Sequence, residues 1–325
     1  MLLLIQYTLL FAAVLLLVAL GGCFSERSGV INIGLEGIMV IGALGGALVM
    51  KFLPYDHETA SALTRLGMFG GVAVASVAAG MLYSLLLAFA SINFKADQTI
   101  VGTALNLLGT AGATVIVKSM NTAINPDDHS SEILYSSARK AFHSTFGTFE
   151  LNWFVVLTVV LLVVAYVVLY KTRFGLRLRA CGEHPQAADS VGINVYKMRY
   201  AGVLISGFFG GLGGITYITA GVSIWKFENG VAGFGFLALA VMIFGAWHPV
   251  KIALAALLFG FFRALGNVHE GLSVIGWIEN LIDAKIPSQI YNMLPYIVSL
   301  IVLAFTSKKS RAPKASGIPY DKGTR

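Results

Sequence analysis

The sequence is poor in charge and has none of the usual motifs for holding nucleotides or metals. Asp, Glu, Lys and Arg make up only 12% of its 325 residues, about half the share of an ordinary soluble domain. No Gly-x-x-x-x-Gly-Lys-[Ser/Thr] phosphate loop occurs in the chain, so any ATP must be handled by another subunit. The six histidines are scattered through loops and predicted helix ends, which argues against a metal site or a membrane-embedded enzyme.

Apolar residues dominate the sequence instead. They make up 57% of the chain, with a mean hydropathy of +0.78, more than a water-soluble fold of this size can turn inward. A bilayer core of about 30 Å needs about 20 apolar residues in a helix. We therefore predict an all-α, polytopic transmembrane bundle of about 9–10 spans. The candidate segments are 2–22, 30–50, 67–91, 98–118, 152–171, 200–220, 233–247, 250–268 and 290–306.

The basic residues predict the orientation of these spans. Six Lys and Arg residues lie in 171–199 and six more in 307–325, and segments rich in Lys and Arg tend to stay in the cytoplasm. An even number of predicted spans separates the two segments, so the assignments agree. Cys23 and Cys181 then also fall on the cytoplasmic side, where a structural disulfide is not expected. Orientation and lipid headgroups explain the net charge of +7, and we expect no nucleic-acid partner.

Two glycine-bearing segments resemble each other weakly. The segment 29–42 is similar to 233–245, and in the predicted topology the two run in opposite directions across the membrane. This pattern predicts a weak inverted internal repeat, a design common in transporters. Small-residue motifs predict close helix contacts within the subunit: Gly42 with Gly46, Gly207 with Gly211, and Gly210 with Gly214.

The most informative stretch lies between the fifth and sixth predicted spans. Pro185 suits the first turn of a helix, because the N–H that proline lacks has no helical partner there. The residues from Gln186 to Val191 can form about two turns, and Gly192 supplies the left-handed residue that ends a helix. The stretch is too polar to span a membrane, so we predict a short, capped helix in a cytoplasmic loop.

Around this predicted helix the sequence resembles a known family. The run Arg179-Ala-Cys-Gly-Glu-His-Pro-Gln-Ala-Ala-Asp-Ser-Val-Gly-Ile-Asn194 resembles the coupling loop of ATP-binding cassette (ABC) importer permeases of the branched-chain amino acid, ribose and nucleoside type. The stretches 25–37, 95–106 and 233–241 are also similar to this family, most of all to its simple-sugar and nucleoside branch. The resemblance extends over nearly all of the predicted spans.

The resemblance implies a non-catalytic permease subunit that imports a nucleoside or a simple sugar across the bacterial plasma (inner) membrane. A branched-chain amino acid is the alternative substrate. The implied transmembrane permease domain is 1–307, with a coupling loop at 172–199 and a flexible cytoplasmic tail at 308–325. The implied partners are an ABC ATP-binding subunit, a second permease subunit (homologous or identical), an extracytoplasmic substrate-binding lipoprotein and the lipid bilayer. No cofactor is expected on this chain, and ATP would be used by the partner subunit.

In this family the short helix of the coupling loop docks into a groove on the ATP-binding subunit. A short capped helix is a stiff lever, and small residues such as Ala187 and Ala188 would let a groove close around it. The competing interpretation is an interfacial helix that only joins two spans. The residues expected to couple to the ATPase subunit are Glu183, His184, Pro185, Gln186, Ala187, Ala188, Asp189 and Gly192.

Four side chains are candidates for the substrate pathway: Asn32, Glu36, Asn106 and Phe236. A charge within a span is costly and should face protein or water, and an aromatic ring could stack on a nucleobase. Helix capping, interhelical hydrogen bonds and packing are the competing roles for these residues. An ion-coupled secondary transporter would need acidic groups at mid-membrane, and Glu36 and Asp97 are the only plausible ones.

Overall fold

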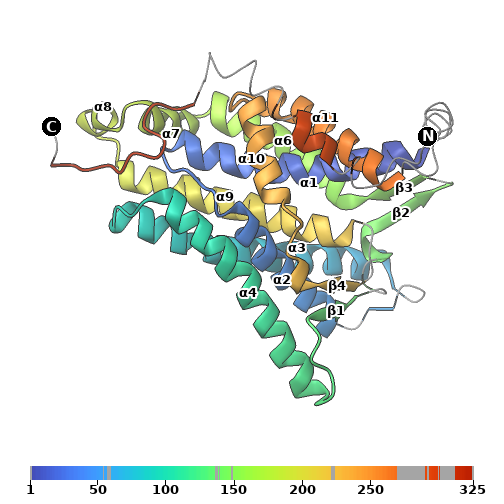
Figure 1. The fold of residues 1–325 in the computed structure, drawn as a ribbon. Helices are drawn as coiled ribbons and strands as arrows, with labels where there is room; N and C mark the ends of the chain where they lie inside the picture. The colour runs from blue at the N-terminus through green and yellow to red at the C-terminus, as the bar shows by residue number, and fades with distance from the viewer. Residues whose placement is uncertain are drawn as a thin grey trace.

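The computed structural model describes residues 2–53, 55–56, 60–135, 138, 140–147, 149–220, 224–268, 290, 293–298, 300 and 312–323. These residues are mainly helical (Figure 1). Eight helical segments among them are long and apolar enough to cross a membrane, which confirms the polytopic helical bundle. The ninth predicted span, 290–306, lies partly outside the described residues, and 290, 293–298 and 300 are helical.

The helices follow the predicted spans closely. They are α1 (Leu2–Arg27), α2 (Leu35–Phe52), α3 (Ala62–Ala88), α4 (Gln98–Ile124), α6 (Trp153–Lys171), α7 (Arg173–Glu183), α8 (Pro185–Ser190), α9 (Val195–Thr219), α10 (Phe234–Phe244) and α11 (Pro249–Val268). A π-helical turn, η1 (Phe89–Asn93), extends α3, and short 3-10 turns occupy η2 (Lys140–Phe142) and η3 (Phe227–Asn229).

Polar residues fix where several helices begin. The Asp97 carboxylate accepts hydrogen bonds from the backbone N–H groups of Thr99 and Ile100, at 2.8 and 3.0 Å, and so caps α4. Asn152 caps α6 and Asn194 caps α9 in the same way. Each cap satisfies N–H groups that the first turn of a helix leaves without partners. The cap at Asp97 thus marks the break between the helical segment α3–η1 and α4.

The centre of the bundle is formed by α1, α2 and α9. α1 is buried without interruption from Leu10 to Glu26, and α9 packs against α1, α2 and α3. Glycines allow these helices to touch: a Cβ added to Gly42 would meet the Cα of Gly211, and one added to Gly214 would meet the backbone of Met39. The structure thus confirms that the predicted small-residue motifs pack helices within the subunit.

Short strands lie at one end of the bundle, near the start of α1 (Figure 1). β1 (Glu132–Leu134) pairs antiparallel with β4 (Ile224–Lys226), with Ile133 opposite Trp225. β2 (His143–Phe146) and β3 (Phe149–Asn152) form a second antiparallel pair. None of these strands was predicted from the sequence.

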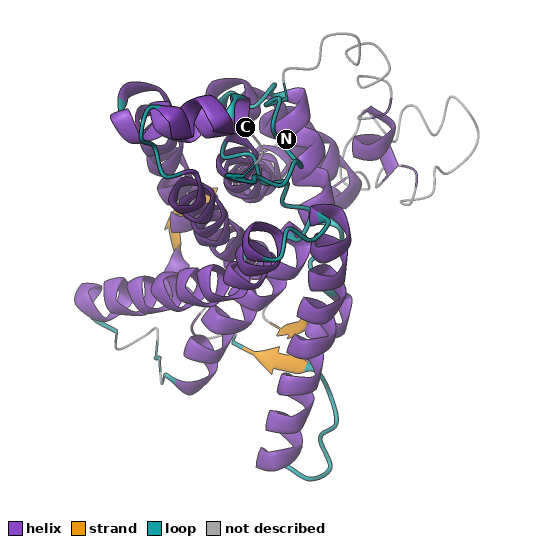
Figure 2. Ribbon diagram, turned by 90° about the vertical axis from the view of Figure 1, so that its left-hand side faces the viewer, coloured by secondary structure: helices purple, strands orange, loops and turns teal. Residues whose placement is uncertain are grey.

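The opposite end carries α7, α8 and the last described segment, 312–323. Figure 2 looks along the bundle from this end. The tail, predicted to be flexible, packs against the protein in its described residues: the backbone N–H of Ala315 donates to the Gly182 carbonyl at 2.8 Å, and the ring of Tyr320 is buried. The composition of the tail suggested disorder, but two of its apolar side chains, Ala315 and Tyr320, are buried against the rest of the protein.

Candidate functional site

The short helix predicted in the loop at 172–199 is present as α8. Pro185 is its first residue, and the Nδ1 atom of His184 accepts a hydrogen bond from the Ala187 N–H at 3.3 Å. Gly192 has a φ of +85°, and its N–H donates to the Asp189 carbonyl at 2.9 Å. The proline start and the glycine end were therefore predicted correctly. A second helix just before it, α7, was not predicted.

α8 has one buried and one exposed face. Pro185 and Ala188 point inward, and Ala188 is only 3% exposed. The exposed residues include Glu183, His184, Gln186, Ala187 and Gly192, and Asp189 is half-buried. From the sequence alone, Ala187 and Ala188 are equally good candidates for contact with a partner protein. In the structure, Ala187 is the one of the two that a partner could reach.

Contacts from three parts of the chain hold α8 in place. Ala188 belongs to a buried cluster with Cys181 of α7, Val195 of α9 and Tyr320 of the tail. Nearby, Glu183 lies 3.6 Å from the guanidinium of Arg27, at the end of α1. α8 is thus joined through its buried face to α7, α9 and the tail, as a stiff lever would need to be.

Arg199, on α9, is a buried residue of this end that the sequence argument used only as a topology marker. It is 1% exposed, and its Nη1 donates to the Ile318 carbonyl at 3.0 Å. Its guanidinium also lies 6.0 Å from the centre of the Tyr320 ring. A single sequence gives no sign of these contacts, because they depend on where the tail folds back.

Glu36 joins the starts of two helices. It lies in the first turn of α2, and its Oε1 and Oε2 accept hydrogen bonds from the N–H groups of Gly233 and Gly235, at 2.8 and 2.6 Å. Those N–H groups belong to the start of α10, where a negative charge is favourable. The two segments of the predicted repeat therefore meet at this carboxylate. Both of its oxygens already accept hydrogen bonds from backbone N–H groups.

Asn106 has a similar arrangement at the start of α2. Its Oδ1 accepts from the Gly37 N–H and its Nδ2 donates to the Ile33 carbonyl, both at 2.9 Å. Asn32, in the break before α2, donates from Nδ2 to the hydroxyl of Ser206 at 2.8 Å. The Oδ1 of Asn32 is buried and has no hydrogen-bond partner among the residues that the structure describes, so this atom can accept a hydrogen bond.

Phe236 is the remaining pathway candidate, and its side chain is far more exposed than those of the three polar candidates. Its side chain is 48% exposed on α10, whereas Asn32 is fully buried and Glu36 and Asn106 are nearly so. The structure brings Glu36 and the start of α10 together. Arg263, another charge within a predicted span, lies 5.3 Å over the ring of Phe234.

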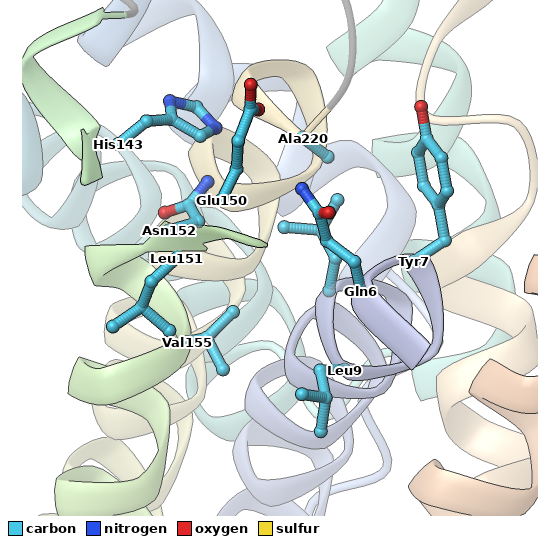
Figure 3. Close-up of a pocket in the computed structure, with 10 residues that line it drawn as sticks. Gln6, Tyr7, Leu9, His143, Glu150, Leu151, Asn152, Val155 and Ala220 are labelled. Carbon is cyan, nitrogen blue, oxygen red and sulfur yellow. The ribbon is translucent and has the colours of Figure 1, made fainter. Parts of the chain in front are cut away.

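Neither notable cavity in the described residues has the form of a translocation pathway. One holds about 50 Å³ between the start of α1 and the β2–β3 end, with Gln6, His143, Glu150 and Asn152 among its polar lining (Figure 3). Ligand pockets usually hold about 300–1,000 Å³, so this one suits water molecules. The other, of about 440 Å³, lies between α3 and α6 and is lined mainly by apolar side chains such as Leu66, Phe69 and Val160.

Comparison with known proteins agrees with this architecture. A helical bundle with many spans and a capped helix between two of them has the form of a multi-pass membrane permease. Residues 4–303 match the family model described as branched-chain amino acid transport system / permease component. The chain belongs to this family, and it is accordingly a transport component of the ABC permease type in the plasma membrane.

Individual relatives match along nearly the whole chain. The guanosine ABC transporter permease protein NupQ of Bacillus subtilis is 42% identical, over 98% of this chain and 96% of its own length. The nucleoside ABC transporter permease protein NupC of Lactococcus lactis is 39% identical, over 97% and 95%. The putative glucose ABC transporter permease protein TsgC13 of Haloferax volcanii is 32% identical, over 93% and 91%.

Proposed function

We propose that this permease imports nucleosides. The observation that carries the proposal is full-length similarity to two permeases whose names specify guanosine or nucleosides, at 42% and 39% identity. Because the similarity extends through α2, α4 and α10, it includes the segments that carry the candidate pathway residues. A simple sugar is the second candidate, favoured by the 32% identity to a putative glucose permease.

The proposed energy source is ATP hydrolysis in a partner subunit. This chain has no phosphate loop, and the proposal assigns it no bound cofactor. The exposed face of α8, with Gln186 and Ala187, would sit in a groove of the ABC ATP-binding subunit. Closure of two such subunits on ATP would push α8, and the buried contacts of Ala188 with α7, α9 and the tail would carry the movement into the bundle.

The proposed pathway needs a second permease subunit to complete it. Neither of the two cavities described above is lined by any of the four pathway candidates, which fits a pathway formed between two permeases. A substrate-binding lipoprotein would deliver the nucleoside from outside. Asn32, with its free Oδ1, and the exposed ring of Phe236 are the better candidates for substrate contact. Glu36 and Asn106 already bond to the backbone, so their proposed part is to hold α2 and α10 in place.

Uptake assays test this function. Cells that express the chain with its ATP-binding, permease and substrate-binding partners should accumulate radiolabelled guanosine, and unlabelled nucleosides should compete. Glucose, ribose or leucine in excess should compete weakly. An ATPase-inactive partner should abolish uptake, whereas collapse of the ion gradients at constant ATP should not. Competition by glucose or ribose alone would support the sugar permease instead, and uptake driven by an ion gradient without ATP would overturn the ABC mechanism.

A further inference from the structure

Aromatic and basic side chains gather where α6 ends and α11 begins. The imidazole ring of His248 lies 4.9 Å from the ring of Tyr170 and 6.1 Å from that of Tyr166, between ring centres. On the same Tyr170 ring, the guanidinium of Arg179 lies 4.6 Å from the centre. Lys251 follows in the first turn of α11 and is exposed. We name these five residues the α6–α11 basic cluster.

Among the described residues, the positive groups of this cluster have no partners of opposite charge. In that part of the chain the Nε of Arg179 and the Nδ1 of His248 are buried without a hydrogen-bond partner. Neither Arg179 nor Lys251 is within ion-pair distance of an acidic group in the described part of the chain. A buried donor without an acceptor is unfavourable, so the cluster should gain from an acceptor that binds there.

The nearby acidic side chains are already engaged. Glu183 pairs with Arg27 at 3.6 Å, and Glu26 accepts a hydrogen bond from the Trp247 indole at 2.7 Å. Burial, together with the positive charges of Lys251 and Arg27, lowers the pKa of His248. These carboxylates therefore do not offset the charges of Arg179 and Lys251, and the start of α11 adds the positive end of a helix dipole.

Apolar side chains lead away from the cluster along both helices. Val163 and Val167 are exposed on α6, and Val250 and Leu254 are exposed on α11. Leu254 alone is 64% exposed. Both helices are long and apolar enough to span a membrane, so these side chains are expected to meet acyl chains. The basic groups lie at the ends of the two spans, which is the level of the lipid headgroups.

We propose that the α6–α11 basic cluster binds an anionic phospholipid of the leaflet predicted to be cytoplasmic. The lipid phosphate would accept hydrogen bonds from Arg179, His248 and Lys251, and its acyl chains would lie along the exposed valines and leucines of α6 and α11. A phospholipid fits better than a free phosphate, because only a lipid uses both the cations and the apolar rows. Basic sites between membrane helices on this side commonly hold anionic lipid headgroups.

Native mass spectrometry of the full chain tests the proposal. The protein would be titrated with phosphatidylglycerol and, separately, with phosphatidylcholine carrying the same acyl chains. Phosphatidylglycerol should bind more tightly to the unaltered chain. Each basic side chain near a membrane surface contributes about fivefold in affinity, so the Arg179→Gln, Lys251→Gln double variant should bind phosphatidylglycerol roughly 25-fold more weakly.

Matched variants separate this result from general damage. Arg65→Gln removes an exposed arginine at the start of α3, at the other end of the bundle, and should leave the affinity unchanged. Arg179→Lys keeps the charge and should lose less affinity than Arg179→Gln at the same melting temperature. Equal binding by the double variant would overturn the proposal, as would displacement of the lipid by inorganic phosphate. Loss of the lipid when the ATP-binding subunit assembles would also overturn it, because the cations would then belong to that interface.

Discussion

Glu36 is a single side chain on which two helices depend. Its two carboxylate oxygens accept from the N–H groups of Gly233 and Gly235, and its own backbone packs where a Cβ at Gly235 would collide. In Glu36→Ala the N–H groups of Gly233 and Gly235, at the start of α10, would both lose the carboxylate that accepts their hydrogen bonds. At about 1–3 kcal/mol for each buried N–H left without a partner, we expect a clear fall in the melting temperature of the purified chain.

Two further variants make this prediction specific to Glu36. Glu36→Gln keeps one strong acceptor and should lie between Glu36→Ala and the unaltered protein. Glu150→Ala removes an exposed glutamate of β3 and should leave the melting temperature unchanged. If Glu36→Ala melted normally but failed in uptake, the carboxylate would serve the substrate pathway and the structural role argued here would be wrong.

At the scale of the secondary-structure elements, α8 provides a paired test of coupling. Ala187 faces outward and Ala188 is 3% exposed beside Cys181, Val195 and Tyr320. Ala187→Trp should obstruct a closely fitting groove, so nucleoside uptake should fall at least tenfold. The melting temperature of the chain should not change, and the ATP-binding subunit should still assemble and hydrolyse ATP without driving transport. Ala188→Trp overpacks the buried face, which typically costs about 1–3 kcal/mol, and should lower the melting temperature.

The measurements for this pair are uptake per membrane-inserted transporter, ATP hydrolysis by the assembled complex and thermal melting of the chain. A matched control is Ser190→Ala, at an exposed position of α8, which should transport normally. Normal uptake by Ala187→Trp would contradict docking through this face. A failure confined to Ala188→Trp would indicate that α8 only joins α7 to α9.

The elements also show why some of the structure was predictable from sequence and some was not. Long apolar runs predict spans because lipid imposes length and hydropathy, and Pro185 with Gly192 predicts α8 because their backbone preferences are local. The pairing of β1 with β4 depends on residues far apart in the chain, and local patterns do not reveal it. The sequence likewise identified Glu36 and Asn106 as unusual polar residues, but their backbone partners follow only from the fold.

At the scale of the whole molecule, the segment 312–323 connects parts of the chain that the sequence places far apart. Tyr320 packs in the cluster that holds Ala188 of α8, and Ile318 accepts a hydrogen bond from Arg199 of α9. The Oδ2 of Asp321 lies 2.8 Å from the Nζ of Lys95, and Lys95 lies in the connection between η1 and α4. The tail therefore bridges α8, α9 and the α3–α4 connection, and movement of α8 should reach the bundle partly through it.

The ion pair of the tail should resist changes in pH. The hydrogen bond from Lys95, helped by its charge, lowers the pKa of Asp321, and the same hydrogen bond raises the pKa of Lys95. A carboxyl group with a lowered pKa stabilises the docked tail above its unfolded value of about 3.9, and this contribution is lost only as pH falls through the lowered pKa. Both side chains are nearly half exposed, so added salt should weaken the pair at neutral pH.

The buried ring of Tyr320 is expected to dominate tail docking. It is 4% exposed, and removal of a buried aromatic side chain typically costs about 3–5 kcal/mol, enough to release a short segment. In Tyr320→Ala we expect faster amide hydrogen exchange in α8 and in 312–323, together with weaker ATP-driven uptake and normal insertion of the spans. Lys322→Ala, at an exposed neighbouring position, should change neither quantity. Unchanged exchange in α8 of Tyr320→Ala would mean that α8 is held by α7 and α9 alone, and the tail would then have no part in transmitting force.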